Sequence, residues 1–187
     1  SSLPRTHRHG FAASGTDGFA VNGDIAPVKG NGGLRVRGGT TLNFSKQPEG
    51  DFDLSATLNA SRLTASESVS GEASMSVRSE DEQAMLSIRR TGEESFEVIA
   101  TVQRTGSTGP QTETIASETV SSVDALRLVR IQKTILFVYS EGGLSRLLSQ
   151  ASFSATPVSD SGIQLRIEPQ SGEVLWKSFE ARMSASG

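Results

Sequence analysis

With 187 residues, 35% of them hydrophobic and 21% charged, and a net charge of −3, the chain has the size of one domain and resembles neither a disordered acidic tail nor a basic nucleic-acid binder. The absence of cysteine excludes disulfides, thiolate catalysis and cysteine-ligated metal centres. No apolar run approaches the roughly 18 residues of a membrane-spanning helix, so we expect neither membrane insertion nor a nucleic-acid partner.

The first ten residues, SSLPRTHRHG, combine Ser, Arg and His without periodicity. This composition predicts a flexible N-terminal tail over residues 1–10, followed by a single domain over residues 11–187. The tail also holds both histidines of the chain, His7 and His9. A Ser-His-Asp triad is therefore excluded from the domain, and we predict no metal site because histidines on a mobile tail are usually solvated.

Beyond the tail, apolar and polar residues alternate with a period of two, which indicates β-strands that bury one face. Residues 52–60 are the clearest example, and similar runs follow between short turn sequences. The predicted strands lie within 33–44, 51–61, 73–77, 84–88, 96–102, 112–120, 126–131, 135–140, 147–153, 163–167 and 174–183. So many strands exceed a simple immunoglobulin unit and predict an all-β fold, a two-sheet antiparallel β-sandwich.

Two connections between these strands carry specific expectations. The central hairpin, residues 126–143, turns at Gln132 and Lys133, neither of which tolerates positive φ as well as Gly or Asn. We therefore expect a loop wider than two residues there. The sequence RTGSTGPQ, residues 104–111, is predicted to be the most flexible loop of the domain.

Four segments carry a family resemblance: GLRVR (33–37), EGDFDLSATLNASRL (49–63), LRLVRIQKTILFVYSEGG (126–143) and VLWKSFEARMSA (174–185). They resemble the concanavalin A-like lectin/glucanase jelly rolls. More narrowly, they are similar to a domain family of unknown function found in large exported proteins of planctomycete bacteria. The resemblance implies a concanavalin A-like jelly roll within a modular bacterial protein. It carries no catalytic residue.

Glycoside hydrolysis is the enzymatic hypothesis to weigh, because catalytic members of this superfamily carry paired carboxylates on one strand, about 5 Å apart in retaining enzymes. The candidate pairs are Asp51 with Asp53 and Glu80 with Glu82. The first pair begins a strand, and the second sits in a turn that is usually solvated or, less often, binds calcium. We predict that the protein is not an enzyme and has no cofactor; calcium has no further support in the sequence.

A glycan-binding face is the competing hypothesis, because adjacent strands would present polar side chains on one side of a sheet. These side chains are Ser74, Ser76, Arg78, Ser87, Arg89, Glu97, Thr101 and Gln103. Arg78 and Arg89 are predicted ligand-binding residues, because guanidinium groups form bidentate contacts with acidic sugars. The alternative is a solvated face with cross-strand Arg–Glu pairs.

The aromatic candidates are Trp176 and Tyr139, each the sole residue of its type. If the register of the last strand is unbroken, Trp176 shares the polar face and is the best residue to stack on a sugar. A β-bulge or a covering loop such as 104–111 would instead bury it. Tyr139 is expected to cap the core with its hydroxyl at the rim, and is the weaker candidate.

Together these features predict a noncatalytic carbohydrate-binding-type module of a larger exported protein, extracellular or periplasmic in location. Its expected partners are a glycan or polysaccharide and other domains of the parent chain. The alternative is a structural or protein-interaction sandwich without a small-molecule ligand. A grooved polar face with converging Arg or Trp side chains favours the first function, and a flat or charge-paired face favours the second.

Overall fold

The computed structural model describes residues 5–23, 25–28, 32–154 and 158–184. In chain order, the elements are β1 (Arg5–Gly10), α1 (Phe11–Ser14), β2 (Phe19–Asn22), β3 (Ile25–Val28), β4 (Gly33–Arg37), β5 (Thr41–Phe44), β6 (Phe52–Asn59), β7 (Glu72–Ser79), β8 (Glu82–Gly92), β9 (Ser95–Gly106), β10 (Gly109–Val120), β11 (Ala125–Ile131), β12 (Thr134–Glu141), β13 (Leu144–Ser152), β14 (Val158–Ile167) and β15 (Glu173–Met183). None of the described helices is long and apolar enough to cross a membrane.

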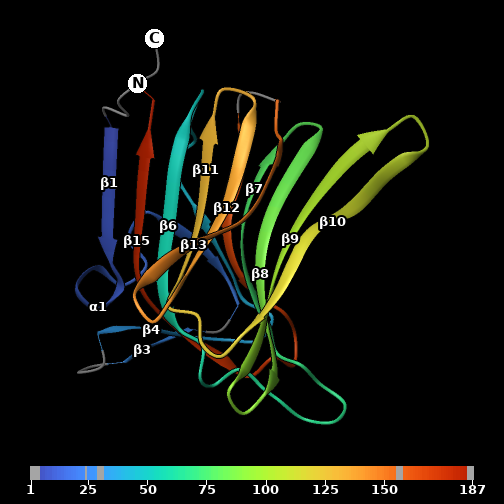
Figure 1. Cartoon of the computed structure of the whole chain (residues 1–187). Helices are drawn as coiled ribbons and strands as arrows, with labels where there is room; N and C mark the ends of the chain where they lie inside the picture. The colour runs from blue at the N-terminus through green and yellow to red at the C-terminus, as the bar shows by residue number, and fades with distance from the viewer. Residues whose placement is uncertain (1–4, 24, 29–31, 155–157, 185–187) are drawn as a thin grey trace.

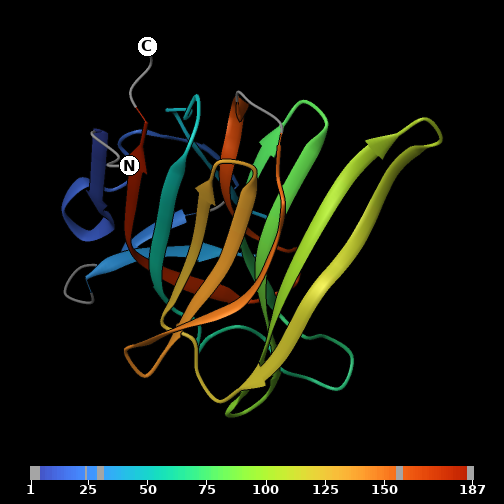
Figure 2. The ribbon, with the colours of Figure 1, turned by 45° about the horizontal axis from the view of Figure 1, so that its top comes forward.

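The strands form two antiparallel sheets packed face to face, which confirms the predicted sandwich (Figures 1 and 2). Sheet A has the strand order β13-β12-β11-β6-β15-β4-β3, and β1 also pairs with β15. Sheet B has the order β10-β9-β8-β7-β14-β5-β2. The β9–β10 hairpin lies at one edge of sheet B and extends away from the body of the sandwich.

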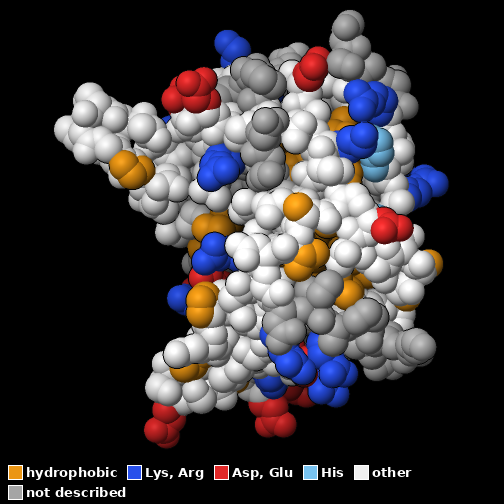
Figure 3. Space-filling model, turned by 180° about the vertical axis from the view of Figure 1, so that it is seen from behind, with side chains coloured by type: hydrophobic (Ala, Val, Ile, Leu, Met, Phe, Trp, Pro, Cys, Tyr) orange, Lys and Arg blue, Asp and Glu red, His pale blue; other side chains and the backbone are white. Residues whose placement is uncertain are grey.

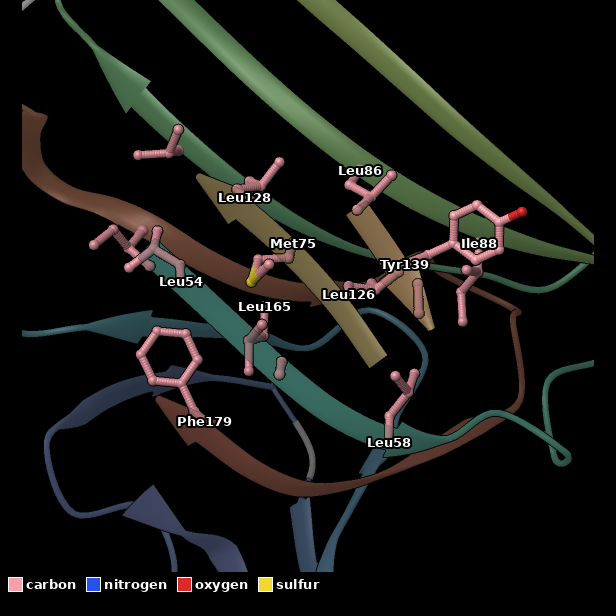
Figure 4. Packing of buried hydrophobic residues seen from close by; sticks show 14 of the residues in the cluster. Leu54, Leu58, Met75, Leu86, Ile88, Leu126, Leu128, Tyr139, Leu165 and Phe179 are labelled. Atoms are coloured by element: carbon pink, nitrogen blue, oxygen red, sulfur yellow. The ribbon is translucent and has the colours of Figure 1, made fainter. Parts of the chain in front are cut away.

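The core lies between the sheets and follows from the alternation along each strand. In β6, the inward residues Phe52, Leu54 and Ala56 have no exposed surface, whereas the residues between them are half-buried. Figure 4 shows Leu54 of sheet A close to Met75 and Leu165 of sheet B. Each buried Leu, Phe or Met side chain contributes about 1.5–3 kcal/mol by leaving water, so the apolar face of each strand favours packing of the two sheets against each other.

The predicted N-terminal tail is wrong for residues 5–10, which form strand β1 along β15. The error arose because both histidines behave as core-facing aromatic residues: His9 packs edge-on against Phe11 and Phe19 at ring distances of 4.5 and 5.2 Å. His7 packs against Phe44, and burial, with Arg5 and Lys46 nearby, lowers its pKa and favours the neutral ring. The part of the prediction on residues 1–4 lies outside the described residues.

The two predicted loops are also tighter than expected. Ile131 pairs directly with Thr134, so the β11–β12 turn has two residues, and Gln132 adopts a φ of 58°. Asp51 makes this possible: its Oδ1 accepts the Gln132 N–H at 2.7 Å. Likewise, Gly106 pairs with Gly109, so the segment predicted as a flexible loop at 104–111 is a continuous hairpin.

Candidate functional site

The outer face of sheet B carries the predicted polar residues, and its middle has an unusual feature. Ser74, Ser76 and Ser87 point away from the core yet are only 2–4% exposed. Because serine is short, the longer side chains around it on the neighbouring strands cover most of its surface. We call this low-lying part of the face the serine trough; its members, in two cross-strand rows, are Ser74, Ser87 and Ile99, and Ser76, Met85 and Thr101.

The serine trough combines hydroxyl groups with apolar surface. Met85 and Ile99 are half-buried and lie on the side of the strand where polar residues otherwise alternate. Their breach of the alternation is the sequence signal for this part of the site. The Thr101 Oγ1 atom is buried without a hydrogen-bond partner, a condition that is uncommon in native proteins.

One end of the serine trough is formed by Arg78, Gln83 and Gln103, which are neighbours on β7, β8 and β9. Arg78 is exposed and makes no ion pair with any described residue. A shallow hollow of about 140 Å³ lies here, bordered also by the turn residues 79–82. Arg78 is therefore placed as predicted, with its cation available.

The opposite end is charge-paired. Arg89 forms an ion pair with Glu97, and Glu72 lies beside Arg89 in the same cross-strand row. Burial raises the pKa of Glu72, and the nearby Glu168 and Glu97 carboxylates add to this effect. Two rows of the trough separate Arg89 from Arg78, so the two predicted arginines do not converge. Figure 3 shows the molecule from the side opposite to Figure 1, with scattered hydrophobic side chains in the middle of the view.

The expected exposure of Trp176 is wrong, and with it the prediction that this ring stacks on a sugar. Trp176 has no exposed surface. The pairing of β15 with β6 shifts register between Trp176 and Ser178, so the strand carries a β-bulge at this point. The bulge turns the indole into the core, which is the alternative that the sequence left open.

Tyr139 also belongs to the core rather than to the outer face. Its ring is 1% exposed, and its hydroxyl donates to Glu118 Oε2 at 2.9 Å. Burial, together with the hydrogen bond to Glu118, raises the pKa of Tyr139. The expectation that it caps the core agrees with this position. Figure 4 shows its hydroxyl directed away from the apolar cluster.

Three of the four carboxylates weighed for glycoside hydrolysis, Asp51, Asp53 and Glu82, are engaged in structural contacts. Asp51 holds the β11–β12 turn, and Asp53 accepts two hydrogen bonds from Arg127 at 2.8 and 2.6 Å. Glu82 accepts the backbone N–H and the hydroxyl of Ser154 at 3.2 and 3.0 Å. In the described part of the chain, no group of three or more metal-ligating side chains comes together.

A family model described as "Protein of unknown function (DUF1583) C domain" matches residues 32–183. The chain belongs to this family. The match of the DUF1583 C domain runs from the start of β4 to the end of β15 and so includes every strand of the serine trough. No curated protein sequence matches the chain.

Several solved structures of other proteins have a fold similar to that of this DUF1583 C domain. The CBM2 module of the evolved Dit of Lactobacillus casei BL23 phage J-1 has a TM-score of 0.68 at 9% identity, with 98% of each chain covered. The legume lectin-like domain from Entamoeba histolytica has a TM-score of 0.63 at 11% identity, covering 90% of this chain and 91% of that one.

A third similar structure is an enzyme. The kappa-carrageenase from Pseudoalteromonas carrageenovora, in complex with an oligotetrasaccharide of kappa-carrageenan, has a TM-score of 0.58 at 5% identity, covering 93% of this chain and 92% of that one. At such identities the likeness establishes the fold alone, which is that of the concanavalin A-like lectins and glucanases. Because this fold serves both binding and catalysis, the function must be argued from the site.

Proposed function

We propose that this DUF1583 C domain is a noncatalytic carbohydrate-binding-type module of a larger exported protein, extracellular or periplasmic, and that the serine trough is its glycan site. The observation that carries the proposal is the trough itself: three nearly buried serines on the outer face of a sheet, flanked by half-buried Met85 and Ile99. A sugar offers both hydroxyl groups and C–H surfaces. Hydroxyl side chains beside apolar side chains complement both.

The arrangement at the trough ends supports a neutral or weakly acidic glycan. Arg78, Gln83 and Gln103 provide donors and acceptors for sugar hydroxyls at one end. At the other end the Arg89 cation is paired with Glu97 and so has less capacity for a second anion. We expect Arg78, not Arg89, to contribute to binding.

The structural roles of Asp51, Asp53 and Glu82 support a noncatalytic module. A retaining or inverting glycosidase needs two carboxylates free to act on the bond between two sugars. Asp53 is held by Arg127, and Asp51 by the Gln132 N–H, both within sheet A and its turn, away from the serine trough.

The experiment that tests the proposal places a bulky side chain in the serine trough, and circular dichroism checks that the variant is folded. Ser87→Phe places a large ring on the trough floor, and Ser55→Phe makes the same change on the outer face of sheet A as a matched control. We expect the wild-type chain to bind a set of glycans on a microarray. Calorimetry with the best of them should show a loss of about tenfold or more for Ser87→Phe, because the ring displaces the ligand from its contacts, and no loss for Ser55→Phe.

The alternative function is a structural or protein-interaction module, and one observation favours it. Leu144 and Leu147, on the edge strand β13 of sheet A, are 64% and 59% exposed. Exposed apolar side chains on a sheet edge are typical of contacts between domains. A microarray without any bound glycan, or equal binding by Ser87→Phe and the wild-type chain, would contradict the glycan-binding proposal and favour this alternative.

A further inference from the structure

A second hollow, of about 350 Å³, lies on the outer face of sheet A, where β4, β15 and β6 run side by side. Residues from three separate parts of the sequence line it. They are Arg35, Asn59, Ser61, Arg62, Glu173, Val174, Leu175 and Lys177. We call it the Lys177 hollow. It belongs to the opposite sheet from the serine trough, so neither site depends on the other.

The Lys177 hollow has an excess of positive charge. Arg35, Arg62 and Lys177 bring three cations, and Glu173 is the carboxylate among the lining residues. Glu173 is shared: its Oε2 lies 3.0 Å from Arg35 Nε and its Oε1 lies 3.4 Å from Arg62 Nη1. Three cations and one carboxylate leave two positive charges, and Lys177 makes no ion pair with the described residues.

The β-bulge in β15 accounts for the position of Lys177. Trp176 pairs with Leu58 and Ser178 pairs with Thr57, so Lys177 is the extra residue and has no partner on β6. This allows Trp176 and Phe179 to enter the core while Lys177 stays exposed between them. Bulges commonly redirect a side chain beside a binding site, and here the redirected side chain is a cation that forms no ion pair within the described part of the chain.

We propose that the Lys177 hollow binds the carboxylate or sulfate group of an acidic sugar residue. Arg35, Arg62 and Lys177 would hold the anionic group, since charge-assisted hydrogen bonds to guanidinium and ammonium groups are stronger than neutral ones. Asn59 and Ser61 provide partners for sugar hydroxyls, and the half-buried Leu175 provides apolar surface. A volume of about 350 Å³ is at the small end for ligand sites, which suits one charged sugar residue.

An adjoining hollow limits the kind of ligand. It shares Lys177, Asn59 and Ser61 with the Lys177 hollow but is also lined by Glu93, Glu94 and Asp124. A densely charged polyanion that extended across both hollows would meet these three carboxylates. The site therefore favours a sugar chain with isolated acidic residues over a heavily sulfated one.

The test is an NMR titration of the ¹⁵N-labelled chain with digalacturonate and, as the matched neutral ligand, its methyl ester. We expect digalacturonate to shift the backbone amides of Asn59, Ser61 and Lys177, and the ester to shift them little. Lys177→Gln and Arg62→Gln should each weaken binding about tenfold, because each removes a charge-assisted contact. Added salt should weaken binding by the wild-type chain.

Two controls make the outcome decisive. Arg182→Gln removes an exposed cation from the same strand, one that is paired with Glu180, and should leave the affinity unchanged. Ser87→Phe blocks the serine trough and should also leave it unchanged. Absence of shifts at the Lys177 hollow, equal binding of acid and ester, or wild-type affinity in Lys177→Gln and Arg62→Gln would overturn the proposal. Loss of digalacturonate binding in Ser87→Phe would also overturn it, by placing the acidic sugar in the trough.

Discussion

At the scale of single residues, the β-bulge in β15 determines which side chains enter the core, as Trp176 and Lys177 show. Without the bulge, Trp176 and Ser178 would share a face of the strand, and the sole tryptophan would stand beside polar residues. With it, Trp176 is fully buried and Lys177 lines a cationic hollow. Trp176 thus contributes to the stability of the core, and its neighbour Lys177 contributes to a proposed binding site.

The burial of Trp176 predicts its fluorescence. The emission maximum of the native chain should be blue-shifted, and acrylamide should quench it poorly, because the indole has no exposed surface. A glycan in the serine trough should leave both properties unchanged, since Trp176 lies in sheet A. The urea-unfolded chain is the control and should show red-shifted, readily quenched emission. A native emission maximum close to that of the unfolded chain would contradict the buried position.

A sequence without an alignment predicts some residues well and others poorly, for a physical reason. The alternation in 52–60 specifies which side chains of β6 enter the core, because strand geometry alone determines this. A bulge depends on the partner strand, so the alternation of the last strand alone places Trp176 on the wrong face, and only the pairing with β6 shows the bulge. Likewise, the buried position of Ser87 arises from longer neighbours on other strands, and nothing in its own segment indicates it.

At the scale of elements, two short features close the sandwich where the sequence predicted disorder or a wide loop. β1 pairs with residues 178–183 of β15 and places His7 and His9 against buried phenylalanines. Histidine occurs on both polar and apolar faces, so the alternation of His7 and His9 does not by itself predict this strand. In the β11–β12 turn, the positive φ of Gln132 is tolerated because Asp51 accepts its N–H from a neighbouring strand end.

The strain at Gln132 predicts a stabilising substitution. A non-glycine residue with a left-handed conformation costs roughly 1 kcal/mol, so Gln132→Gly should raise the free energy of unfolding by up to that amount. The matched control is Gln150→Gly in the extended strand β13, which should lower the free energy of unfolding because glycine weakens a strand. Urea denaturation of both variants measures the difference. A destabilised Gln132→Gly variant would contradict the proposed strain.

At the scale of the whole molecule, the two sheets have different outer faces. Sheet B has a trough of small hydroxyl side chains with charges at its ends, and sheet A has a cationic hollow and an exposed apolar edge. Each site brings together residues far apart in the chain, such as Arg35, Asn59 and Lys177 in the hollow. The sandwich could be predicted from local alternation, but these groupings require the register between strands, which no single segment contains.

The cross-strand row of Glu72, Arg89 and Glu97 at the end of the serine trough, here called the charge row, makes the stability of the fold depend on pH. Burial and the carboxylates of Glu168 and Glu97 raise the pKa of Glu72, although Arg89 opposes them. The folded chain then holds the Glu72 proton more tightly than the unfolded chain. The stability that this proton confers is fully present below the usual pKa of glutamate, about 4.3, and is lost as the pH rises through the higher pKa of the folded state.

Glu72→Gln tests this linkage, because glutamine imitates the protonated side chain at every pH. The variant should be more stable than the wild-type chain at pH 7, because the half-buried Glu72 carboxylate is costly to ionise, and the difference should shrink as the pH falls through the raised pKa of the folded state and be gone below about 4. Urea denaturation at both pH values measures it, with Glu67→Gln on an exposed loop as the matched loss of one carboxylate. If Glu72→Gln is instead less stable at pH 7, its attraction to Arg89 outweighs burial and the neighbouring carboxylates. Glu72 would then hold the Arg89 side chain in place at the end of the serine trough, and the charge row would strengthen sheet B at neutral pH instead of weakening it.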